Sequence, residues 1–572
     1  GVLVTDYNEI PAVWNFHNAA TSLRDAVYQA INQTSIDIGM YSSPSAFSTT
    51  LAEDIAHLYQ EGRIDGDRII ESAARVIQLK GKLGLFDGSP VPPQQTMPID
   101  SYRTHSATPA GETCFFGCPE HHAMAYNATR DSMTLLENDG ILPLNASNLP
   151  GKRIAVVGRS CNSVPYMAGG WTVHWQGSHD PADFPYGTTV LDEFRARFGS
   201  DNVVYSPGCS LEEGSSCTAE ELQNATTTAT MAVVTIVCVG EAPYAEIVGD
   251  IYNLTLPGGQ IALVEALHGV NPHIVTVLIE GRPRVLGAIP SLSRAVLHAY
   301  LPGPFGGRAI TESLLGIHRP CGRLPITYPK YLSDGPLQYW RRYSADQFGD
   351  FEPQWEFGHS KPYDLFLYSG ITAALHELSD IEVNATVTNW GSATATQTVP
   401  LFITQTGRPM PAEVKLLMDI RKITLAPGES GQVNFKFSLF NLRYYNEVGC
   451  KCLAIRPTFA TVGTSKPMVN PPGGNTVKVE LGLAPHGPDD IIDLSECPLE
   501  PYFRARMVKS AFAPSGAPPP AGLGESEDYF MSSVVCFVGG VIATCLLVFF
   551  VRRKNRARHE SSTVQLFEPS GV

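Results

Sequence analysis

The sequence predicts a multidomain protein in which α/β domains are followed by a β-sandwich and one transmembrane helix. Three observations support this prediction. Apolar, β-branched segments alternate with helical segments up to about residue 335, short alternating strands fill residues 380–483, and an uncharged apolar run lies near the C-terminus. The chain has 572 residues, 43% of them hydrophobic, which exceeds the size of a single core, so we expect at least three domains.

Residues 1–90 are predicted to form two βα units. The segment GVLVTDY (1–7) has the aliphatic character of a buried strand, and TSIDIGM (34–40) is a second, shorter one. Helical segments follow, at 19–33 after the first strand and at 51–62 and 65–86 after the second. Two strands do not make a stable sheet alone. We interpret this region as the C-terminal part of a (β/α)8 barrel whose earlier strands precede Gly1, followed by a linker over residues 91–124.

Residues 125–335 are predicted to form an open α/β sandwich. Four apolar, β-branched runs have the composition of strands buried on both faces of a parallel sheet, and they lie at 153–158, 231–240, 273–281 and 294–303. Helical segments at 188–199, 257–269 and 306–316 fall between or after them. The segment after the first of these strands lacks the glycine spacing of a dinucleotide loop, so we expect no nucleotide site there.

The C-terminal part of the chain changes character twice. After a connecting segment at 336–379, residues 380–483 contain alternating strands with turn signals between them, which predicts an immunoglobulin-like sandwich. A juxtamembrane stalk at 484–531, rich in proline and glycine towards its end, then leads to a predicted transmembrane helix at 532–551. Its core, Val534 to Val551, is an uncharged run long enough to span a bilayer with little tilt.

The charge that follows the apolar run predicts the orientation of the chain. The cluster RRKNRARH opens the tail at 552–572, and such clusters face the cytoplasm, so we expect the N-terminal region to be extracellular or luminal, with a signal sequence upstream. Sequons for N-glycosylation all fall on the predicted outer side, at Asn32, Asn127, Asn145, Asn224, Asn253 and Asn384.

Charge and cysteine content restrict the function further. A net charge of −15 argues against nucleic-acid partners, because binding to phosphates requires a basic surface. The twelve cysteines show no metal-type CxxC pairs, but three close couples occur, and some of these would be disulfides in an oxidising compartment. The couples are Cys114 with Cys118, Cys209 with Cys217, and Cys450 with Cys452.

Two acids stand out by their position. Asp6 comes at the end of the first apolar strand, and Glu241 follows the strand at 231–240. Active sites of barrels and of open α/β sheets lie at the carboxyl ends of strands. The competing interpretation is that each acid caps the following helix, since acids are favoured at helix N-termini.

Several motifs then occur in a characteristic order. GVLVTDY is followed by SMTLLENDGILPLN, GGWTVHWQG, VGEAPYAEIVGD, IEGRPRV, YLPGPFGGRAI, GRLPITYP and WEFGHS. This series resembles glycoside hydrolase family 3, over residues 1 to about 480, and is most similar to its β-glucosidase and β-glucan exohydrolase branch. The resemblance implies that the sandwich is the fibronectin-III-like domain found in many members.

The resemblance also implies roles for particular residues. Asp6 matches the catalytic nucleophile and Glu241 the general acid/base of a retaining mechanism, with Glu246 as second choice for the acid/base. Tyr7 and Trp171 are the candidates for stacking on a sugar ring, with core packing as the alternative and Trp175 as the competitor of Trp171. No metal or organic cofactor is implied.

Departures from the family pattern leave alternatives open. Glu137 stands where the family usually has Lys, and Tyr7 where it has Trp, while Asp37 is expected to be a structural residue. The implied function is a membrane-anchored, exo-acting β-glucosidase that hydrolyses terminal glucosyl residues of β-glucosides or β-glucan oligosaccharides, with membrane lipid as its other partner. The alternatives are a β-xylosidase and a non-catalytic surface protein that binds carbohydrate or protein.

Overall fold

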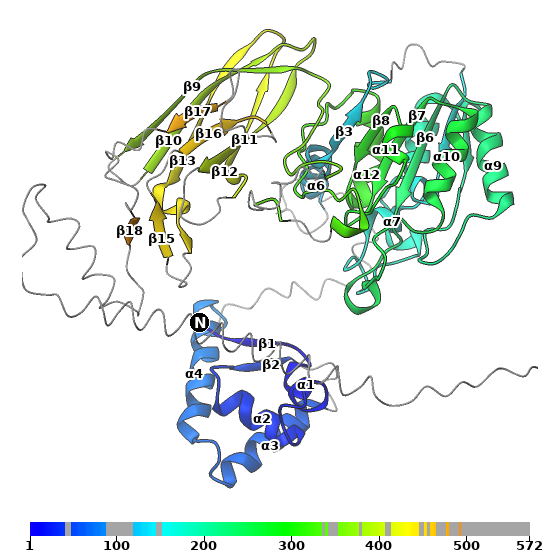
Figure 1. Ribbon diagram of the computed structural model, residues 1–572. Coiled ribbons are helices and arrows are strands. Elements are labelled where there is room, and N and C mark those ends of the chain that lie inside the picture. The colour runs from blue at the N-terminus through cyan, green and yellow to red at the C-terminus, as the bar shows by residue number, and fades with distance from the viewer. Residues whose placement is uncertain are drawn as a thin grey trace, which may run out of the picture.

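The computed structural model describes residues 1–40, 47–86, 118–144, 152–334, 338–340, 353–376, 380–405, 413–445, 451–454, 458–464, 476–479 and 491–493. These form an N-terminal βα unit, a mixed-sheet domain and a β-sandwich (Figure 1). The predicted stalk beyond residue 493, the transmembrane segment, the tail and Asn145 lie outside the described residues. Among the residues that are described, no helix combines the length and the apolar character needed to cross a bilayer.

The N-terminal unit has the predicted order of strand, helix, strand, helix. Strands β1 (Val4–Tyr7) and β2 (Ile38–Met40) pair in parallel. The helices are α1 (Glu9–Asn15), α2 (Leu23–Asn32), α3 (Phe47–Gln60) and α4 (Gly66–Lys82), of which the sequence did not predict α1. Their small core contains Ile10, Ala26, Val27, Ala30, Leu58 and Ile64. This unit therefore has a core of its own beneath an open pair of strands.

The middle domain is built on a six-stranded sheet with the order β3-β8-β7-β6-β4-β5. The strands are β3 (Thr134–Asn138), β4 (Ile154–Val157), β5 (Val203–Ser206), β6 (Val234–Gly240), β7 (Ile274–Ile279) and β8 (Ala295–His298). All pair in parallel except β3, which is antiparallel to β8. The four predicted strands are confirmed, and β3 and β5 are additional edge strands.

Helices cover both faces of this sheet, as its completely buried central strands require. One group consists of α6 (Pro119–Ser132), α8 (Val190–Phe198) and α12 (Gly306–Leu314), with the short α7 (Val164–Ala168) beside α12. The other group consists of α9 (Ala219–Thr230), α10 (Gln260–Val270) and α11 (Ile289–Leu292). The start of α6 lies inside residues 91–124, so the predicted linker is shorter at its C-terminal end than expected.

The third unit is a sandwich of two sheets, with strand orders β13-β10-β9 and β12-β11-β16-β17. Its strands are β9 (Phe366–His376), β10 (Asp380–Asn389), β11 (Ala395–Gln405), β12 (Leu416–Leu425), β13 (Ser430–Ser438), β16 (Thr458–Val462) and β17 (Thr476–Val479). A small third sheet contains β14 (Tyr444–Tyr445), β15 (Lys451–Ala454) and β18 (Ile491–Asp493). The predicted boundary at residue 380 is wrong by one strand, because β9 pairs with β10 along its length.

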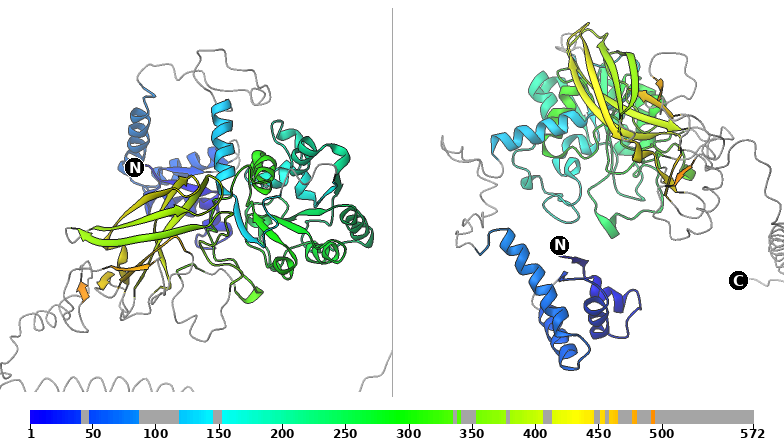
Figure 2. Two further views of the ribbon diagram at one scale, coloured as in Figure 1. Left: turned by 90° about the horizontal axis from the view of Figure 1, so that it is seen from above. Right: turned by 90° about the vertical axis from the view of Figure 1, so that its left-hand side faces the viewer.

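Polar side chains join the sandwich to the sheet domain, beside which it lies in Figure 1 and in the left view of Figure 2. Arg323 donates hydrogen bonds to the carbonyl oxygens of Thr398 (2.6 Å), Gly358 (2.9 Å) and Gly463 (3.1 Å). Lys415, whose side chain is 1% exposed, forms an ion pair of 3.1 Å with Glu356. A buried cation is stable only with such partners, so these contacts fix the joint between the two domains.

Candidate active site

The predicted acid/base segment is a loop after β6, at the carboxyl edge of the sheet. The strand ends at Gly240, where an added Cβ would lie 1.7 Å from the carbonyl oxygen of Ile279. Only glycine permits this approach of β6 to β7. The buried side chain of Gln260, at the start of α10, accepts a hydrogen bond from the Gly240 N–H and donates one to its carbonyl, both at 2.9 Å. The point at which the loop begins is therefore fixed.

Glu241, the first residue of the loop, is buried and surrounded by donors. Its Oε1 accepts hydrogen bonds from Nε of Arg282 at 2.8 Å and from Nε of Arg284 at 2.7 Å. Its Oε2 accepts one from the Tyr244 hydroxyl at 3.1 Å. The side chain is 3% exposed. Both oxygens are thus occupied by the protein itself.

The Arg284 guanidinium continues this network to a second loop. It forms an ion pair with Glu213 and donates to the carbonyl oxygen of Asn253 at 3.0 Å. Burial opposes its charge, but Glu241 and Glu213 raise the pKa of Arg284 above its ordinary value. The acid/base loop is therefore connected through Arg284 to residues 209–217.

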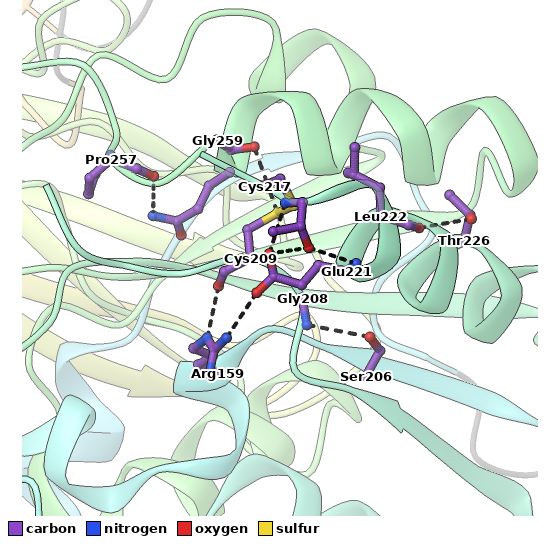
Figure 3. Close-up of a disulfide and its surroundings, with 12 residues drawn as sticks. Arg159, Ser206, Gly208, Cys209, Cys217, Glu221, Leu222, Thr226, Pro257 and Gly259 are labelled. Carbon is purple, nitrogen blue, oxygen red and sulfur yellow. Dashed lines mark hydrogen bonds and ion pairs between the residues drawn. A yellow bond between two sulfur atoms is a disulfide. The ribbon is translucent and has the colours of Figure 1, made fainter. Parts of the chain in front are cut away.

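A disulfide between Cys209 and Cys217, one of the three close couples in the sequence, closes that second loop (Figure 3). Arg159 donates to the Cys209 carbonyl oxygen at 3.2 Å and pairs with Glu221 at 3.0 Å. A further disulfide, Cys161 to Cys238, joins β6 to the segment after β4 and was not predicted, because its partners are 77 residues apart.

Tyr244, within the acid/base loop, contacts both Glu241 and Arg282. The Arg282 guanidinium stacks on its ring at 3.8 Å from the centroid, and Nε of the same arginine donates to its hydroxyl at 2.9 Å. Burial, and the negative charge of Glu241 beside it, raise the pKa of Tyr244 to about 12. The tyrosine therefore stays protonated and can donate to Glu241 throughout the physiological pH range.

Glu246, five residues further on, differs from Glu241 in its surroundings. It is exposed, and its backbone adopts a positive φ of 34° at the start of a 3-10 turn. Its Oε2 accepts a hydrogen bond from the indole Nε1 of Trp175 at 3.2 Å. Such a backbone conformation is uncommon for a residue with a side chain, and strained conformations of this kind cluster at active sites and in turns. The Glu246 carboxylate is thus held at the surface beside an aromatic ring.

The predicted aromatic loop, residues 169–177, packs directly on the acid/base loop. An added Cβ on Gly170 would lie 2.0 Å from the Tyr244 carbonyl oxygen, and the Ala245 N–H donates to the Gln176 side chain at 2.9 Å. Trp171 is 68% exposed, and its ring centroid lies 6.4 Å from that of Trp175. Core packing of Trp171 is therefore excluded, and Trp175, whose ring lies near that of Trp171, is the indole that contacts Glu246.

The predicted nucleophile lies in the N-terminal unit. Asp6 and Tyr7 are the last two residues of β1, and both are exposed. The Tyr7 N–H donates to the Asp6 carboxylate at 2.7 Å. Figure 1 shows β1 apart from the sheet domain that contains β6. The structure therefore does not bring Asp6 together with Glu241 or Glu246, although the retaining mechanism implied by the resemblance requires two carboxyl groups beside one sugar bond.

Two further acids, Asp37 and Glu137, are held by hydrogen bonds and ion pairs within the protein. Asp37, as predicted, accepts hydrogen bonds from Arg75 and Ser72, and these donors hold the pKa of its carboxyl well below the usual range. Glu137 accepts a hydrogen bond from the Trp355 indole at 2.8 Å and pairs with Lys361 at 3.4 Å. The acid at position 137 is thus accommodated by an indole donor and a lysine.

Sequence reasoning missed a buried acid directly behind the site. Glu280 follows β7, is fully buried, and accepts a hydrogen bond from the Tyr328 hydroxyl. Burial, together with the charge of Glu241, raises the pKa of Glu280 to about 8. Its position at the end of a strand, within the motif IEGRPRV, was a signal available from the sequence.

The chain is similar in sequence to known glycosidases. Residues 133–363 match the family model described as the glycosyl hydrolase family 3 C-terminal domain. The chain is 31% identical over 466 residues to a lysosomal beta glucosidase of Dictyostelium discoideum, covering 78% of this chain and 53% of that protein. It is 27% identical over 465 residues to a beta-xylosidase of Formosa agariphila, covering 78% and 60%.

Solved structures show the same fold. A beta-glucosidase from Listeria innocua in complex with isofagomine has a TM-score of 0.68 and 22% identity, covering 84% of this chain and 63% of that one. The chain thus spans between half and two thirds of the length of these relatives. Through residues 133–363, the comparisons link the chain to glycosyl hydrolase family 3.

Proposed function

We propose that this chain acts as a retaining, exo-acting β-glycosidase with preference for β-glucosides, in which Glu246 is the general acid/base and Asp6 the nucleophile. The observation that carries the proposal is the placement of Glu246, an exposed carboxylate bonded to the exposed indole of Trp175, which in turn lies near the exposed ring of Trp171. Aromatic faces bind the apolar faces of sugar rings, and a carboxyl group next to them can exchange a proton with the glycosidic oxygen.

The surroundings of the two candidate acids favour Glu246 over Glu241 for proton transfer. A general acid/base must come within hydrogen-bond reach of the substrate oxygen. Glu241 is 3% exposed, and its oxygens are held by Arg282, Arg284 and Tyr244. We assign Glu241 a supporting role, in which it positions the arginines below the loop that carries Glu246.

The mechanism requires the two carboxyl groups on opposite sides of one sugar bond. Asp6 attacks the anomeric carbon while Glu246 protonates the leaving oxygen, and Glu246 then removes a proton from the water that releases the sugar. In retaining enzymes the two groups stand roughly 5 to 5.5 Å apart. The N-terminal unit must therefore approach the 169–177 and 241–250 loops for reaction. Tyr7 and Trp171 would then contact the sugar from the two sides.

The test is turnover of 4-nitrophenyl β-D-glucoside and β-D-xyloside by the full chain. We expect Glu246→Gln to lower kcat/KM about 10² to 10⁴-fold and to remove one limb of the pH–rate profile. Asp6→Asn should abolish turnover. If Glu246→Gln leaves the profile unchanged while Glu241→Gln removes a limb in a folded protein, the acid/base assignment is wrong. If a folded chain cleaves neither substrate, the non-catalytic alternative is favoured, and faster cleavage of the xyloside would favour the β-xylosidase.

We also propose a single-pass membrane location with the described residues on the outer side. The support is the apolar run and basic cluster of the sequence, together with the exposure of the sequons at Asn32, Asn127, Asn224 and Asn253. Asn384 is half-buried on β10 and bonded to Glu382 and Asn434, so we expect little glycan there. Loss of mass on treatment with an N-glycosidase, followed site by site, tests this topology, and unmodified exposed sequons after expression in a secretory host would contradict it.

A further inference from the structure

Three side chains with metal-binding atoms converge at the junction of the sheet domain and the sandwich. Asp131 lies near the end of α6, and His318 and Cys321 lie in the turn after α12, three residues apart. One ligand atom from each of the three lies within 4.8 Å of the others. Imidazole, thiolate and carboxylate together are the ligand types that zinc prefers.

His318 offers an available lone pair to this cluster. Its Nε2 is buried and has no hydrogen-bond partner among the described residues. Burial lowers the pKa of His318 to about 4, so the ring is neutral at physiological pH. A buried ring nitrogen without a partner is unfavourable, because a hydrogen bond to water is lost and not replaced. A cation bound at Nε2 would supply the missing partner.

Cys321 is a free, buried thiol, 3% exposed, and its Sγ lies 3.7 Å from the Asp131 carbonyl oxygen. Burial raises the pKa of this thiol above its ordinary value. Burial therefore favours the thiol over the thiolate here. A bound metal would stabilise the thiolate.

Asp131 already has two cationic partners. Arg130 pairs with its Oδ1 at 3.1 Å, and Lys422, from β12 of the sandwich, pairs with its Oδ2 at 3.2 Å. The side chains of Asp131 and Lys422 are 34% and 44% exposed, so solvent reaches the cluster from this side. Lys422 is therefore the group that an incoming metal ion would displace.

We propose that Asp131, His318 and Cys321 form a binding site for a borderline-soft divalent cation, Zn²⁺ in the first place, with solvent as a fourth ligand. With zinc–ligand bonds of about 2.0–2.3 Å, the donor atoms of a tetrahedral site stand roughly 3.3–3.8 Å apart. The present separations, up to 4.8 Å, require side-chain movements on the order of 1 Å to close.

When Zn²⁺ binds, it replaces the proton of the Cys321 thiol and the ammonium of Lys422. The Cys321 Sγ–H bond breaks, a Zn–S bond forms, and the proton leaves to solvent, while His318 Nε2 and an Asp131 oxygen complete the protein ligands. The ammonium of Lys422 leaves Asp131 for solvent. No oxidation is involved. Because Lys422 belongs to the sandwich and the three ligands to the sheet domain, the metal competes with a contact between the two domains.

The experiment titrates the full, metal-stripped chain with Co²⁺ and Zn²⁺ in the absence of reductant. We expect one Co²⁺ per chain at this site, with a thiolate-to-cobalt charge-transfer band and visible bands of tetrahedral cobalt, reversed by Zn²⁺. Cys321→Ser should abolish the charge-transfer band, and His318→Ala should weaken binding at least tenfold. His268→Ala, which removes a histidine bonded to the Leu292 carbonyl at 3.0 Å, is the matched control and should change neither.

Lys422→Met provides the sharper result, because it removes the competitor and no ligand. We expect this variant to bind Zn²⁺ several-fold more tightly than the unmodified chain. Circular dichroism of each variant establishes folding before titration. The proposal is overturned if the folded chain shows no thiolate-to-cobalt band, or if Cys321→Ser leaves the band unchanged. It is equally overturned if Lys422→Met weakens binding. None of these outcomes depends on glycosidase activity.

Discussion

Arg284 places its Nε 2.7 Å from Oε1 of Glu241, and the two side chains are 1% and 3% exposed. A charged pair this deeply buried is stable only while both partners remain. The second ion pair of Arg284, with Glu213, connects the acid/base loop to the loop closed by the Cys209–Cys217 disulfide. The position of the loop that carries Glu246 thus depends on charges buried at its start.

Replacement of Arg284 by Met should therefore be strongly destabilising. It leaves the Glu241 carboxylate buried with one ion-pair partner fewer, and we expect a loss of about 3–5 kcal/mol in the free energy of unfolding. Arg294→Met is the matched control, because Arg294 and Asp139 form a surface pair with 35% and 50% exposed side chains. That variant should lose less than about 1 kcal/mol. Urea unfolding measures both losses. If they were equal, the buried Arg284–Glu241 pair would contribute no more to the free energy of unfolding than the surface pair.

The ionisation of the Glu280 carboxyl should make the free energy of unfolding depend on pH. Its pKa is about 8 in the folded protein, against an ordinary value of 4.5, so the folded state retains a proton that the unfolded state has released between these values. The contribution of Glu280 to stability is therefore complete below about pH 4.5 and declines as the pH rises towards 8, by about 1.4 kcal/mol per pH unit.

The measurement is the difference in unfolding free energy between the unmodified chain and Glu280→Gln, followed from pH 5 to pH 8. The amide cannot ionise, so the variant should gain stability relative to the unmodified chain as the pH rises. A difference that stays constant over this range would show that Glu280 does not titrate there.

Trp171 should act in substrate binding. Removing its exposed ring by Trp171→Ala should raise KM for aryl glycosides about three- to tenfold with little change in stability, since stacking contributes about 0.5–1.5 kcal/mol. Trp390→Ala is the control, because Trp390 is exposed to a similar degree, 67%, but lies just after β10 of the sandwich. Steady-state kinetics would contradict the assignment if both variants behaved alike.

The Cys209–Cys217 disulfide should stabilise the loop that carries Glu213. Replacing both cysteines by Ser opens a loop with a sequence separation of 8 and should lower the unfolding free energy by about 2–3 kcal/mol. If Glu213 supports the catalytic loop, kcat should fall as well, and Glu213→Gln should lower kcat in the same direction without breaking the disulfide. If kcat were unchanged in both variants, the loop that carries Glu213 would have no role in turnover.

Much of the fold could be predicted because the strong signals were local. The fully buried strand β6 is an unbroken apolar run, and the alternation of β10 appears directly as alternating burial. The edge strand β3 was missed, since its pairing with β8 is antiparallel and depends on a partner about 160 residues away. Strand β9 was missed for a similar reason, because its register is set by β10.

The site residues stay a prediction. The strand-end rule selected the loop at Glu241, but it could not distinguish a buried acid held by two arginines from an exposed one beside an indole. That distinction depends on Arg284 and Trp175, which are 43 and 71 residues from the acids they contact. The expected meeting of Asp6 with this loop depends on the arrangement of whole units, which no local pattern encodes.

The joint between the sheet domain and the sandwich has a consequence for how freely the sandwich can vary. All three acceptors of Arg323 are main-chain carbonyl oxygens, contributed by Gly358, Thr398 and Gly463. This part of the joint follows the course of the backbone, whereas Lys415 and Lys422 of the sandwich contribute side-chain ion pairs to Glu356 and Asp131. A sandwich with a different surface could therefore be exchanged onto the same sheet domain, provided that its loops followed the same path past Arg323 and that these two lysines were kept.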